Sequence, residues 1–160
     1  MKIDKGEKTN VMRLLDQKKI EYEIKVLEGA DGLTGTEIAE KLEENPEQAF
    51  KTLVTTGKTG NHYVFVIPVA AELNLKKAAS VVGEKNIEML KQKDLLPLTG
   101  YVHGGCSPIG MKKFFRTVIN DTAKQFEEMY FSAGKIGHQV RVKVSDVEKV
   151  IRVEFADVIN

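Results

Sequence analysis

Residues 50–67 decide the fold, because they contain two apolar runs separated by a turn. The first run reads Phe50-Lys51-Thr52-Leu53-Val54, the intervening turn residues are 57–61, and the second run reads Tyr63-Val64-Phe65-Val66-Ile67. Short apolar runs on either side of glycine and asparagine are typical of a β-hairpin. Because the second run has no polar residue, both of its faces are expected to be buried in a sheet.

Helix and strand patterns interleave on both sides of this hairpin. Thr34-Gly35-Thr36-Glu37 has the spacing of a capping box, and Asn74 precedes an apolar helical face that stops at Gly83. Tyr22–Val26 and residues 138–144 alternate between apolar and polar, which predicts strands. The interrupted alternation favours an α/β fold with a mixed sheet rather than a purely parallel one.

Weaker local signals predict further elements in the rest of the chain. They are helices capped by Asn10, Asn45 and Ser145, a short helix around residues 86–91, a turn or short helix beginning at Asp121, and strands over residues 114–119 and 128–133.

Length and charge restrict the function classes. The chain has 160 residues, which predicts a single domain over residues 1–160, and its 24 Lys plus Arg against 23 Asp plus Glu give a net charge of +1. A domain that grips nucleic acid by overall positive charge is excluded. Lys76-Lys77 and the group Lys112, Lys113 and Arg116 are local basic spots, which either touch a nucleic-acid backbone or simply face solvent.

Cysteine and histidine usage also narrows the possibilities. Cys106 is the only cysteine, which favours a reducing compartment, and the histidines have no metal-ligand spacing. The first residues lack a signal-peptide pattern, and the longest apolar run, Tyr63 to Ala71, is too short for a membrane helix. We therefore expect a cytoplasmic protein without a metal, a cofactor or a membrane segment.

Residues 100–110, called the glycine loop below, read Gly-Tyr-Val-His-Gly-Gly-Cys-Ser-Pro-Ile-Gly. So many glycines indicate backbone at positive φ or a ligand close to the main chain. The amides around Gly104-Gly105 form either a nest for an oxyanion or phosphate, or part of a tight turn that Pro108 shapes. The spacing matches neither a P-loop nor a dinucleotide fingerprint.

Two side chains invite catalytic interpretations. Lys51 either faces solvent or supplies a fixed cation to a pocket. Cys106 is three residues from His103, but a buried apolar filler is the commoner role of a free cysteine and is favoured here.

Several motifs together resemble the YbaK/EbsC family over nearly the whole chain. The resemblance rests on the lysine-bearing strand at residues 50–54, on residues 66–69 and 75–79, on the glycine loop with Lys112-Lys113, and on residues 132–137. It implies an α/β half-barrel with a strongly curved sheet, and a trans-editing aminoacyl-tRNA deacylase related to the editing domain of prolyl-tRNA synthetase. The branch it most resembles clears Cys-tRNA(Pro).

The resemblance also implies a mechanism and its partners. The substrate's own cysteine thiol attacks its ester, so the enzyme, a hydrolase or lyase by class, supplies no nucleophile. Partners are the aminoacylated 3′ end of tRNA and, transiently, prolyl-tRNA synthetase.

Site residues follow from the same resemblance. Backbone N–H groups of Gly104 and Gly105 hold the oxyanion, and Lys51 holds the terminal adenosine or its phosphate. The residues expected to bind substrate are Tyr22, Thr52, Ser107, Ser132 and Gln139.

The chain departs from the family pattern at three positions. Some relatives have Asp where Gln139 aligns, and arginine is common where this chain has Ile136. Cys106 occupies a variable position, which again favours a filler.

Other functions remain open at this point. The chain is alternatively a deacylase for another small residue, such as alanine on tRNA(Pro), which needs an activated water. It is alternatively a non-catalytic module that binds tRNA or synthetase, or a regulatory protein that binds a small nucleotide.

Overall fold

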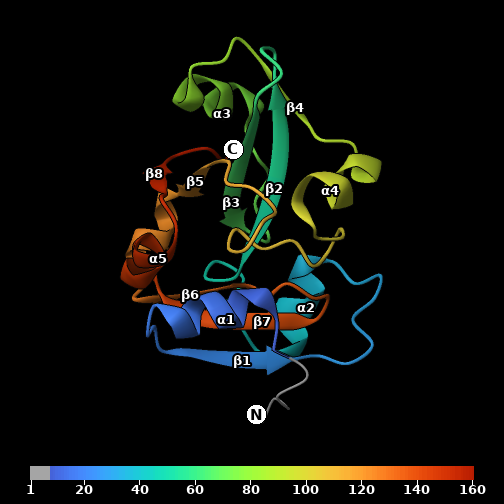
Figure 1. Cartoon of the computed structure of the whole chain (residues 1–160), viewed down its shortest axis with the longest axis vertical. Helices are drawn as coiled ribbons and strands as arrows, with labels where there is room; N and C mark the ends of the chain where they lie inside the picture. The colour runs from blue at the N-terminus through green and yellow to red at the C-terminus, as the bar shows by residue number, and fades with distance from the viewer. Residues whose placement is uncertain (1–7) are drawn as a thin grey trace.

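Two β-sheets with helices packed against them make up the molecule, shown as a computed structural model in Figure 1, which describes residues 8–160. A three-stranded sheet has the order β1-β7-β6, and a five-stranded sheet has the order β4-β2-β3-β5-β8. The strands are β1 (Tyr22–Val26), β2 (Phe50–Gly57), β3 (His62–Pro68), β4 (Ile87–Met89), β5 (Arg116–Asn120), β6 (Glu128–Ser132), β7 (His138–Lys143) and β8 (Glu154–Ala156). The helices are α1 (Asn10–Gln17), α2 (Gly35–Lys41), α3 (Leu75–Val82), α4 (Gln92–Thr99) and α5 (Val144–Val150), with a 3₁₀ helix at Asp121–Gln125.

The predicted hairpin lies at the centre of the larger sheet. β2 and β3 pair antiparallel, with Phe50 opposite Pro68 and Thr56 opposite His62. β3 then pairs parallel with β5, and β5 pairs parallel with β8. Side chains of β3 after His62 are buried, as the absence of polar residues predicted. The α/β fold with a mixed sheet and flanking helices is therefore confirmed.

A short connection joins the two sheets where β2 begins. Ala49 forms an isolated bridge with Tyr130 of β6, whose amide donates to the Gln48 carbonyl at 3.1 Å. The Gln48 side chain also donates to the Glu128 carbonyl at 2.8 Å.

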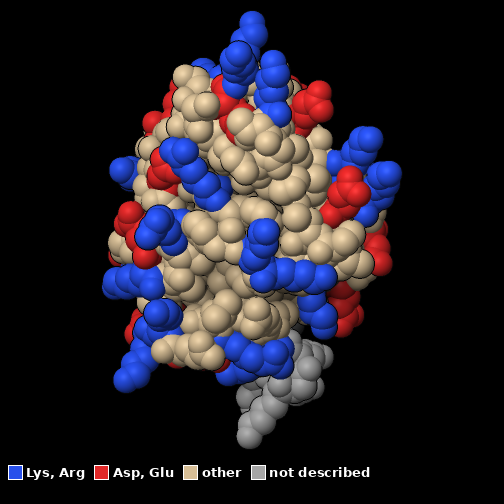
Figure 2. All heavy atoms as spheres, turned by 45° about the horizontal axis from the view of Figure 1, so that its top comes forward, with Lys and Arg blue, Asp and Glu red and all other residues tan. Residues whose placement is uncertain are grey.

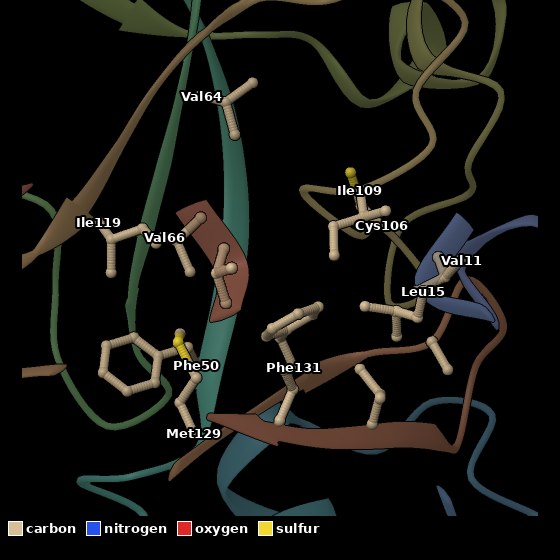
Figure 3. Packing of buried hydrophobic residues seen from close by; sticks show 14 of the residues in the cluster. Val11, Leu15, Phe50, Val64, Val66, Cys106, Ile109, Ile119, Met129 and Phe131 are labelled. Carbon is tan, nitrogen blue, oxygen red and sulfur yellow. The ribbon is translucent and has the colours of Figure 1, made fainter. Parts of the chain in front are cut away.

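The main hydrophobic core lies between the two sheets and the glycine loop. It gathers buried residues of α1, β2, β3, β6 and β7. Figure 3 shows Cys106 and Ile109 of the glycine loop reaching into this cluster, across from Val64 and Val66. A second cluster packs α3 against the other face of the hairpin. The glycine loop is thus anchored by apolar burial at its C-terminal half.

Local capping signals account for the starts of α2 and α3. The Thr34 hydroxyl accepts from the Glu37 amide, and the Glu37 carboxylate accepts from the Thr34 amide, so the capping box is confirmed. Asn74 caps α3 by accepting from the Lys77 amide at 3.0 Å, and Gly83 ends it at φ +77°. Only glycine adopts that conformation readily.

Three predicted helix starts were wrong. α1 is capped by Thr9, whose hydroxyl accepts from the Met12 amide, rather than by Asn10. Asn45 begins only a hydrogen-bonded turn, because Ala49 shortly beyond it already pairs with β6. α5 begins at Val144 without a side-chain cap, so the capping-box spacing at Ser145 is unused.

The helix predicted over residues 86–91 was also wrong. Ile87–Met89 form β4 and pair with Thr55–Gly57 of β2, and the helix follows at α4. α4 lacks a side-chain cap and contains Pro97, so its local helix signals are limited to Asp94 in the first turn and Gly100 at the C-terminal end. Among residues 8–160, none of the helices is long and apolar enough to cross a membrane.

Candidate functional site

The glycine loop begins with a tight turn. The Gly105 amide donates to the Val102 carbonyl at 3.0 Å, and Gly104 at the third position has φ +88°. A positive φ at this position of a β-turn strongly favours glycine. A tight turn is therefore present between Val102 and Gly105, but Pro108, which was expected to shape it, lies outside it, and the loop joins α4 to β5 rather than two strands.

A glycine is also required at position 105, because the backbone there contacts the segment that follows β6. A Cβ atom on Gly105 would lie 3.1 Å from the Ile136 nitrogen and 3.3 Å from the Lys135 carbonyl carbon. Gly104 has more room, since the nearest neighbour of a Cβ atom at that position would be Ile136 Cγ1 at 3.6 Å. The two backbone segments thus meet at Gly105.

A buried hydroxyl ties the same two segments together. Ser132, at the end of β6, donates to the Gly105 carbonyl at 3.0 Å and accepts from the Gly134 amide at 3.0 Å. Ser132 therefore positions the glycine loop, and its oxygen already has two hydrogen-bond partners.

The far end of the loop is closed by Tyr101. Its hydroxyl donates to the Ile109 carbonyl at 2.6 Å, and burial raises the pKa of Tyr101 to about 12. A Cβ on Gly110, which has φ +84°, would lie 2.7 Å from that hydroxyl. A hydrogen bond between two of its own residues therefore closes the loop.

The thiol and hydroxyl inside the loop are both buried. Cys106 is 8% exposed, and burial raises the pKa of its thiol to about 12. Ser107 has no exposed surface, and its hydroxyl accepts from the Ile109 amide at 3.4 Å. Neither side chain presents a reactive atom to the surface.

The two backbone amides proposed for the oxyanion differ in availability. Gly104 is exposed, and its N–H forms no hydrogen bond to the backbone of residues 8–160. The Gly105 N–H is engaged by Val102. Of these two amides, only that of Gly104 is available to a ligand in this conformation.

The side chains of Lys51 and Thr52 lie on opposite faces of β2, because successive side chains of a strand point to opposite faces of the sheet. Thr52 shares the face of Phe50 and Val54, which pack in the core that includes the glycine loop. Its hydroxyl oxygen is buried without a hydrogen-bond partner in the described part of the chain.

Lys51 shares the other face, with Leu53, and is half-buried. Burial lowers its pKa, and the Glu72 carboxylate acts in the opposite direction. Within residues 8–160 its ammonium forms no ion pair. Lys51 is therefore a half-buried cation that feels the Glu72 carboxylate but forms no ion pair in that range.

Gln139 lies in a row across the smaller sheet. In register, Lys25 of β1 pairs with Gln139 of β7, which pairs with Ser132 of β6. The Lys25 ammonium donates to the Leu42 carbonyl at 3.1 Å and lies 5.0 Å from the centre of the Tyr130 ring. Gln139 thus neighbours the residue that clamps the glycine loop.

Tyr22 is at the other end of β1. Its hydroxyl donates to the Asp16 carboxylate at 2.9 Å, and burial is the main cause that raises its pKa to about 12. It lines a hollow of about 730 Å³ beside α1, and none of the described residues lining that hollow belongs to the glycine loop.

Comparisons with known proteins agree with this architecture. Residues 30–150 match the model of the aminoacyl-tRNA editing domain. The chain is 42% identical over 153 residues to EbsC of Enterococcus faecalis, a provisionally assigned Cys-tRNA(Pro)/Cys-tRNA(Cys) deacylase, and the match covers 95% of this chain and 93% of EbsC. The chain belongs to the aminoacyl-tRNA editing domain family. The predicted membership of the YbaK/EbsC family is thereby confirmed.

Solved structures show the same fold for this editing domain. A provisionally assigned trans-editing enzyme for prolyl-tRNA synthetase has a TM-score of 0.80 and 19% identity, covering 95% of this chain and 98% of its own. A second solved structure, of a hypothetical protein, has a TM-score of 0.86 and 19% sequence identity. The match covers 95% of this chain and 100% of that protein's chain.

The editing domain brings together only part of the predicted site. Gly104, Gly105 and Ser132 meet at one point, and Gln139 lies beside Ser132. Ser107 is inside the loop, whereas Thr52, Lys51 and Tyr22 have no described hydrogen bond to it. Their roles stay predictions.

Sequence reasoning missed the residues that hold the loop from outside. Lys135 and Ile136 approach Gly105, and Gly137 at φ +80° leaves room for the Leu27 carbonyl, which a Cβ atom at that position would overlap. The end of β1 near Leu27, rather than Tyr22, therefore adjoins the segment that contacts the loop. The available signal was the pair of glycines at 134 and 137.

Side chains able to bind a metal do not cluster in the described part of the chain. Within residues 8–160, no group of three or more His, Cys, Asp or Glu side chains gathers in a way that could hold a metal ion.

Proposed function

We propose that this protein is an aminoacyl-tRNA deacylase that removes cysteine mischarged onto tRNA(Pro), using the thiol of the substrate as the nucleophile. Membership of the editing family supports the substrate class and the enzyme class. The name of the Enterococcus relative supports cysteine as the amino acid, with Cys-tRNA(Cys) as a second substrate.

One observation carries the substrate-assisted mechanism: the thiol and the two serine hydroxyls nearest the glycine loop are all occupied or inaccessible. The Cys106 thiol is buried and protonated at neutral pH, since its pKa is about 12. Ser107 is fully buried, and the Ser132 oxygen is held by two backbone partners. None of these three groups is placed to attack the ester, which supports a nucleophile from the substrate or from water.

The proposed reaction balances without a co-reactant. The cysteine sulfur bonds to the ester carbonyl carbon, the bond to the ribose 3′ oxygen breaks, and the thiol proton ends on that oxygen. The products are free tRNA and a thiolactone, which water later opens to cysteine. Holding the thiol against the carbonyl is worth about 7–11 kcal/mol of the barrier when the geometry is fixed.

The Gly104 amide is the proposed oxyanion donor, because it is exposed and unpaired in the backbone of the described residues. A second donor from Gly105 requires its amide to leave the Val102 carbonyl. Preorganised donors aimed at a developing oxyanion are commonly among the largest contributions to acyl-transfer catalysis.

Lys51 and Thr52 are proposed to bind the terminal adenosine or its phosphate. The half-buried Lys51 ammonium forms no described ion pair, and the Thr52 oxygen is buried without a described hydrogen-bond partner. Because the side chains of Lys51 and Thr52 lie on opposite faces of β2, they are proposed to contact different parts of the substrate.

Prolyl-tRNA synthetase is the proposed transient partner. With a net charge of +1, the chain lacks the positive excess for tight tRNA binding on its own. A partner that holds the tRNA body would leave this domain to handle the 3′ end. Such a complex works in the cytoplasm, where tRNA is charged.

The test is a deacylation panel with Cys-, Ala-, Ser- and Pro-tRNA(Pro), in which the released product is identified by mass spectrometry. We expect rapid release from Cys-tRNA(Pro), with the thiolactone, which is lighter than cysteine by one water, detected by its mass at early times. Ser-tRNA(Pro) is expected to survive, since a hydroxyl is a poor nucleophile at neutral pH compared with a thiol.

Matched variants distinguish residues of the proposed site from residues elsewhere on the surface. Lys51→Ala is expected to slow deacylation, whereas Lys58→Ala, an exposed lysine in the hairpin turn, serves as the control. Cys106→Ala is expected to retain activity. Equal turnover of Ala-tRNA(Pro) with free alanine as product would replace the thiol mechanism by an activated water, and no turnover of any substrate would favour a binding module.

A further inference from the structure

Exposed apolar side chains concentrate next to the glycine loop. Leu96, Val102 and Phe114 are 51%, 45% and 57% exposed, and they are three of the five large apolar side chains exposed in the described chain. Their positions all fall between residues 96 and 114, a stretch that surrounds the loop. An aromatic ring that is more than half exposed has no role in the core.

Hydrogen bonds join the segments that carry these side chains. The Lys112 amide donates to the Thr99 carbonyl at 3.0 Å, and its ammonium donates to the Pro97 carbonyl at 3.4 Å. The C-terminal end of α4, the start of the glycine loop and residues 112–114 are therefore adjacent on the surface. We call the residues Leu96, Val102, Lys112, Lys113 and Phe114 the loop-side strip.

The charge around this strip is positive. Residues 91–114 contain Lys91, Lys93, Lys112 and Lys113 but a single carboxylate, Asp94. None of these lysines forms an ion pair within residues 8–160. On the face shown in Figure 2, blue side chains also lie near the middle, whereas red ones lie toward the margins.

This combination of groups matches one class of partner. Single-stranded nucleic acid is held by aromatic rings that stack on bases and by cations that contact the backbone. A protein partner that is mainly apolar has no need of lysines without ion pairs in the same strip. Because the net charge of the chain is small, its overall charge supplies little affinity for nucleic acid, and local groups such as these have to supply it.

We propose that the loop-side strip binds the single-stranded 3′ end of tRNA, with Phe114 stacked on a base and Lys112 and Lys113 on the phosphates. The inference rests on the proposed function, because it places the last unpaired nucleotides beside the loop that handles the ester. Leu96 and Val102 form the apolar edge along which the strand lies.

The test measures binding without chemistry. A fluorescently labelled RNA oligonucleotide ending in CCA is titrated with the full chain and with its variants. Phe114→Ala is expected to weaken binding by about 5- to 150-fold, the range that corresponds to loss of one base stack. Phe114→Tyr should bind like the parent, and Phe114→Leu should bind like Phe114→Ala, because leucine is apolar but cannot stack.

The lysines and a distant apolar residue provide the second arm. Lys113→Ala should weaken binding and reduce the slope of log K against log salt by about 0.7, the contribution of one phosphate in a single strand. Leu75→Ala, an exposed apolar residue on α3, is the matched control and should leave binding unchanged.

Outcomes distinguish this inference from the proposed function. If the parent binds the oligonucleotide in a Phe114-dependent way but cleaves no aminoacyl-tRNA, the deacylase proposal fails and the strip stands. If Phe114→Ala and Phe114→Leu bind RNA as tightly as the parent, the inference is overturned. Loss of binding to purified prolyl-tRNA synthetase in those variants, with RNA binding intact, would make the strip a protein interface and would overturn it equally.

Discussion

The Ser132 hydroxyl donates a hydrogen bond to the carbonyl oxygen of Gly105 at 3.0 Å, across 27 residues of chain. That bond, together with the one from the Gly134 amide, fixes the glycine loop against the end of β6. The position of the Gly104 amide, which is the proposed oxyanion donor, is therefore expected to depend on the Ser132 side chain, which acts through the Gly105 carbonyl.

Replacing Ser132 by alanine tests this positioning role. Ser132→Ala leaves the Gly105 carbonyl and the Gly134 amide without a buried partner, so we expect a loss of about 1–3 kcal/mol in the free energy of unfolding. The kcat for deacylation should fall more than KM rises, because the loop loses its register. Urea unfolding and steady-state kinetics measure both, with Ser80→Ala on the exposed side of α3 as control. An unchanged kcat would show that the clamp has no catalytic effect.

Gly105→Ala tests the close approach of two backbone segments. The new Cβ would lie 3.1 Å from the Ile136 nitrogen, a backbone atom that cannot rotate away. We expect destabilisation of about 1–3 kcal/mol from overpacking, accompanied by loss of deacylation.

The control for this variant is Gly29→Ala, at φ +69° with no atom within 4 Å of its Cβ position. It should lower stability by about 1 kcal/mol through backbone strain and leave deacylation intact. Equal activity of the two variants would contradict the role of the contact at Gly105.

Thr52→Val exchanges an unpaired hydroxyl for a methyl group of similar size. Because the Thr52 oxygen is buried without a partner among the described residues, the variant should be more stable by about 1 kcal/mol. If the hydroxyl binds substrate as proposed, the same change should raise KM for Cys-tRNA(Pro).

A matched control lies on the same strand. The Thr55 hydroxyl donates to the Tyr63 carbonyl at 2.9 Å, so Thr55→Val should destabilise the protein. Thermal unfolding of the two variants in parallel measures the contrast. A Thr52→Val protein that is more stable and fully active would remove Thr52 from the site.

Glu44 makes stability depend on pH. It is 5% exposed, neither carboxylate oxygen has a hydrogen-bond partner within residues 8–160, and burial raises its pKa from 4.5 to about 7, with Lys25 opposing. The folded protein therefore binds the proton more tightly than the unfolded chain. Stability contributed by this group is present below pH 4.5 and is lost as the pH rises through 7. The loss is at most about 3 kcal/mol, and smaller to the extent that water screens the carboxylate.

Glu44→Gln should abolish that loss. Urea unfolding across this pH range should show that the free energy of unfolding of the variant increases relative to that of the parent as the pH rises. This difference should level off once the pH is well above the raised pKa of Glu44. Glu47→Gln, an exposed neighbour, should run parallel to the parent. Parallel curves for Glu44→Gln as well would mean that Glu44 is ionised in the fold without penalty.

Local signals predicted the elements whose ends are set by their own side chains. Thr34 and Glu37 cap each other, and Asn74 and Gly83 bound α3, so sequence spacing was sufficient there. β4 and β8 were missed because they are strands through pairing with β2 and β5, which no local pattern of three residues records.

The candidate site was predictable in residue identity but not in geometry. The glycines and Ser132 were found through the motif, yet the hydrogen bond that occupies the Gly105 amide depends on the turn that Gly104 permits. Alternation along β2 separates Lys51 from Thr52, and the position of Tyr22 on β1 directs it to Asp16. Such relations follow from register, which single residues do not encode.

The bridge between Ala49 and Tyr130 joins the two sheets over which the proposed site is distributed. Lys51 and Thr52 belong to the larger sheet, whereas Ser132, which clamps the glycine loop, belongs to the smaller one. A substrate bound to both would act as a second crosslink between the sheets. The Tyr130 amide hydrogen, which is bonded to the Gln48 carbonyl where the sheets join, would then exchange more slowly when substrate is bound. Its exchange rate would therefore report whether the site is occupied.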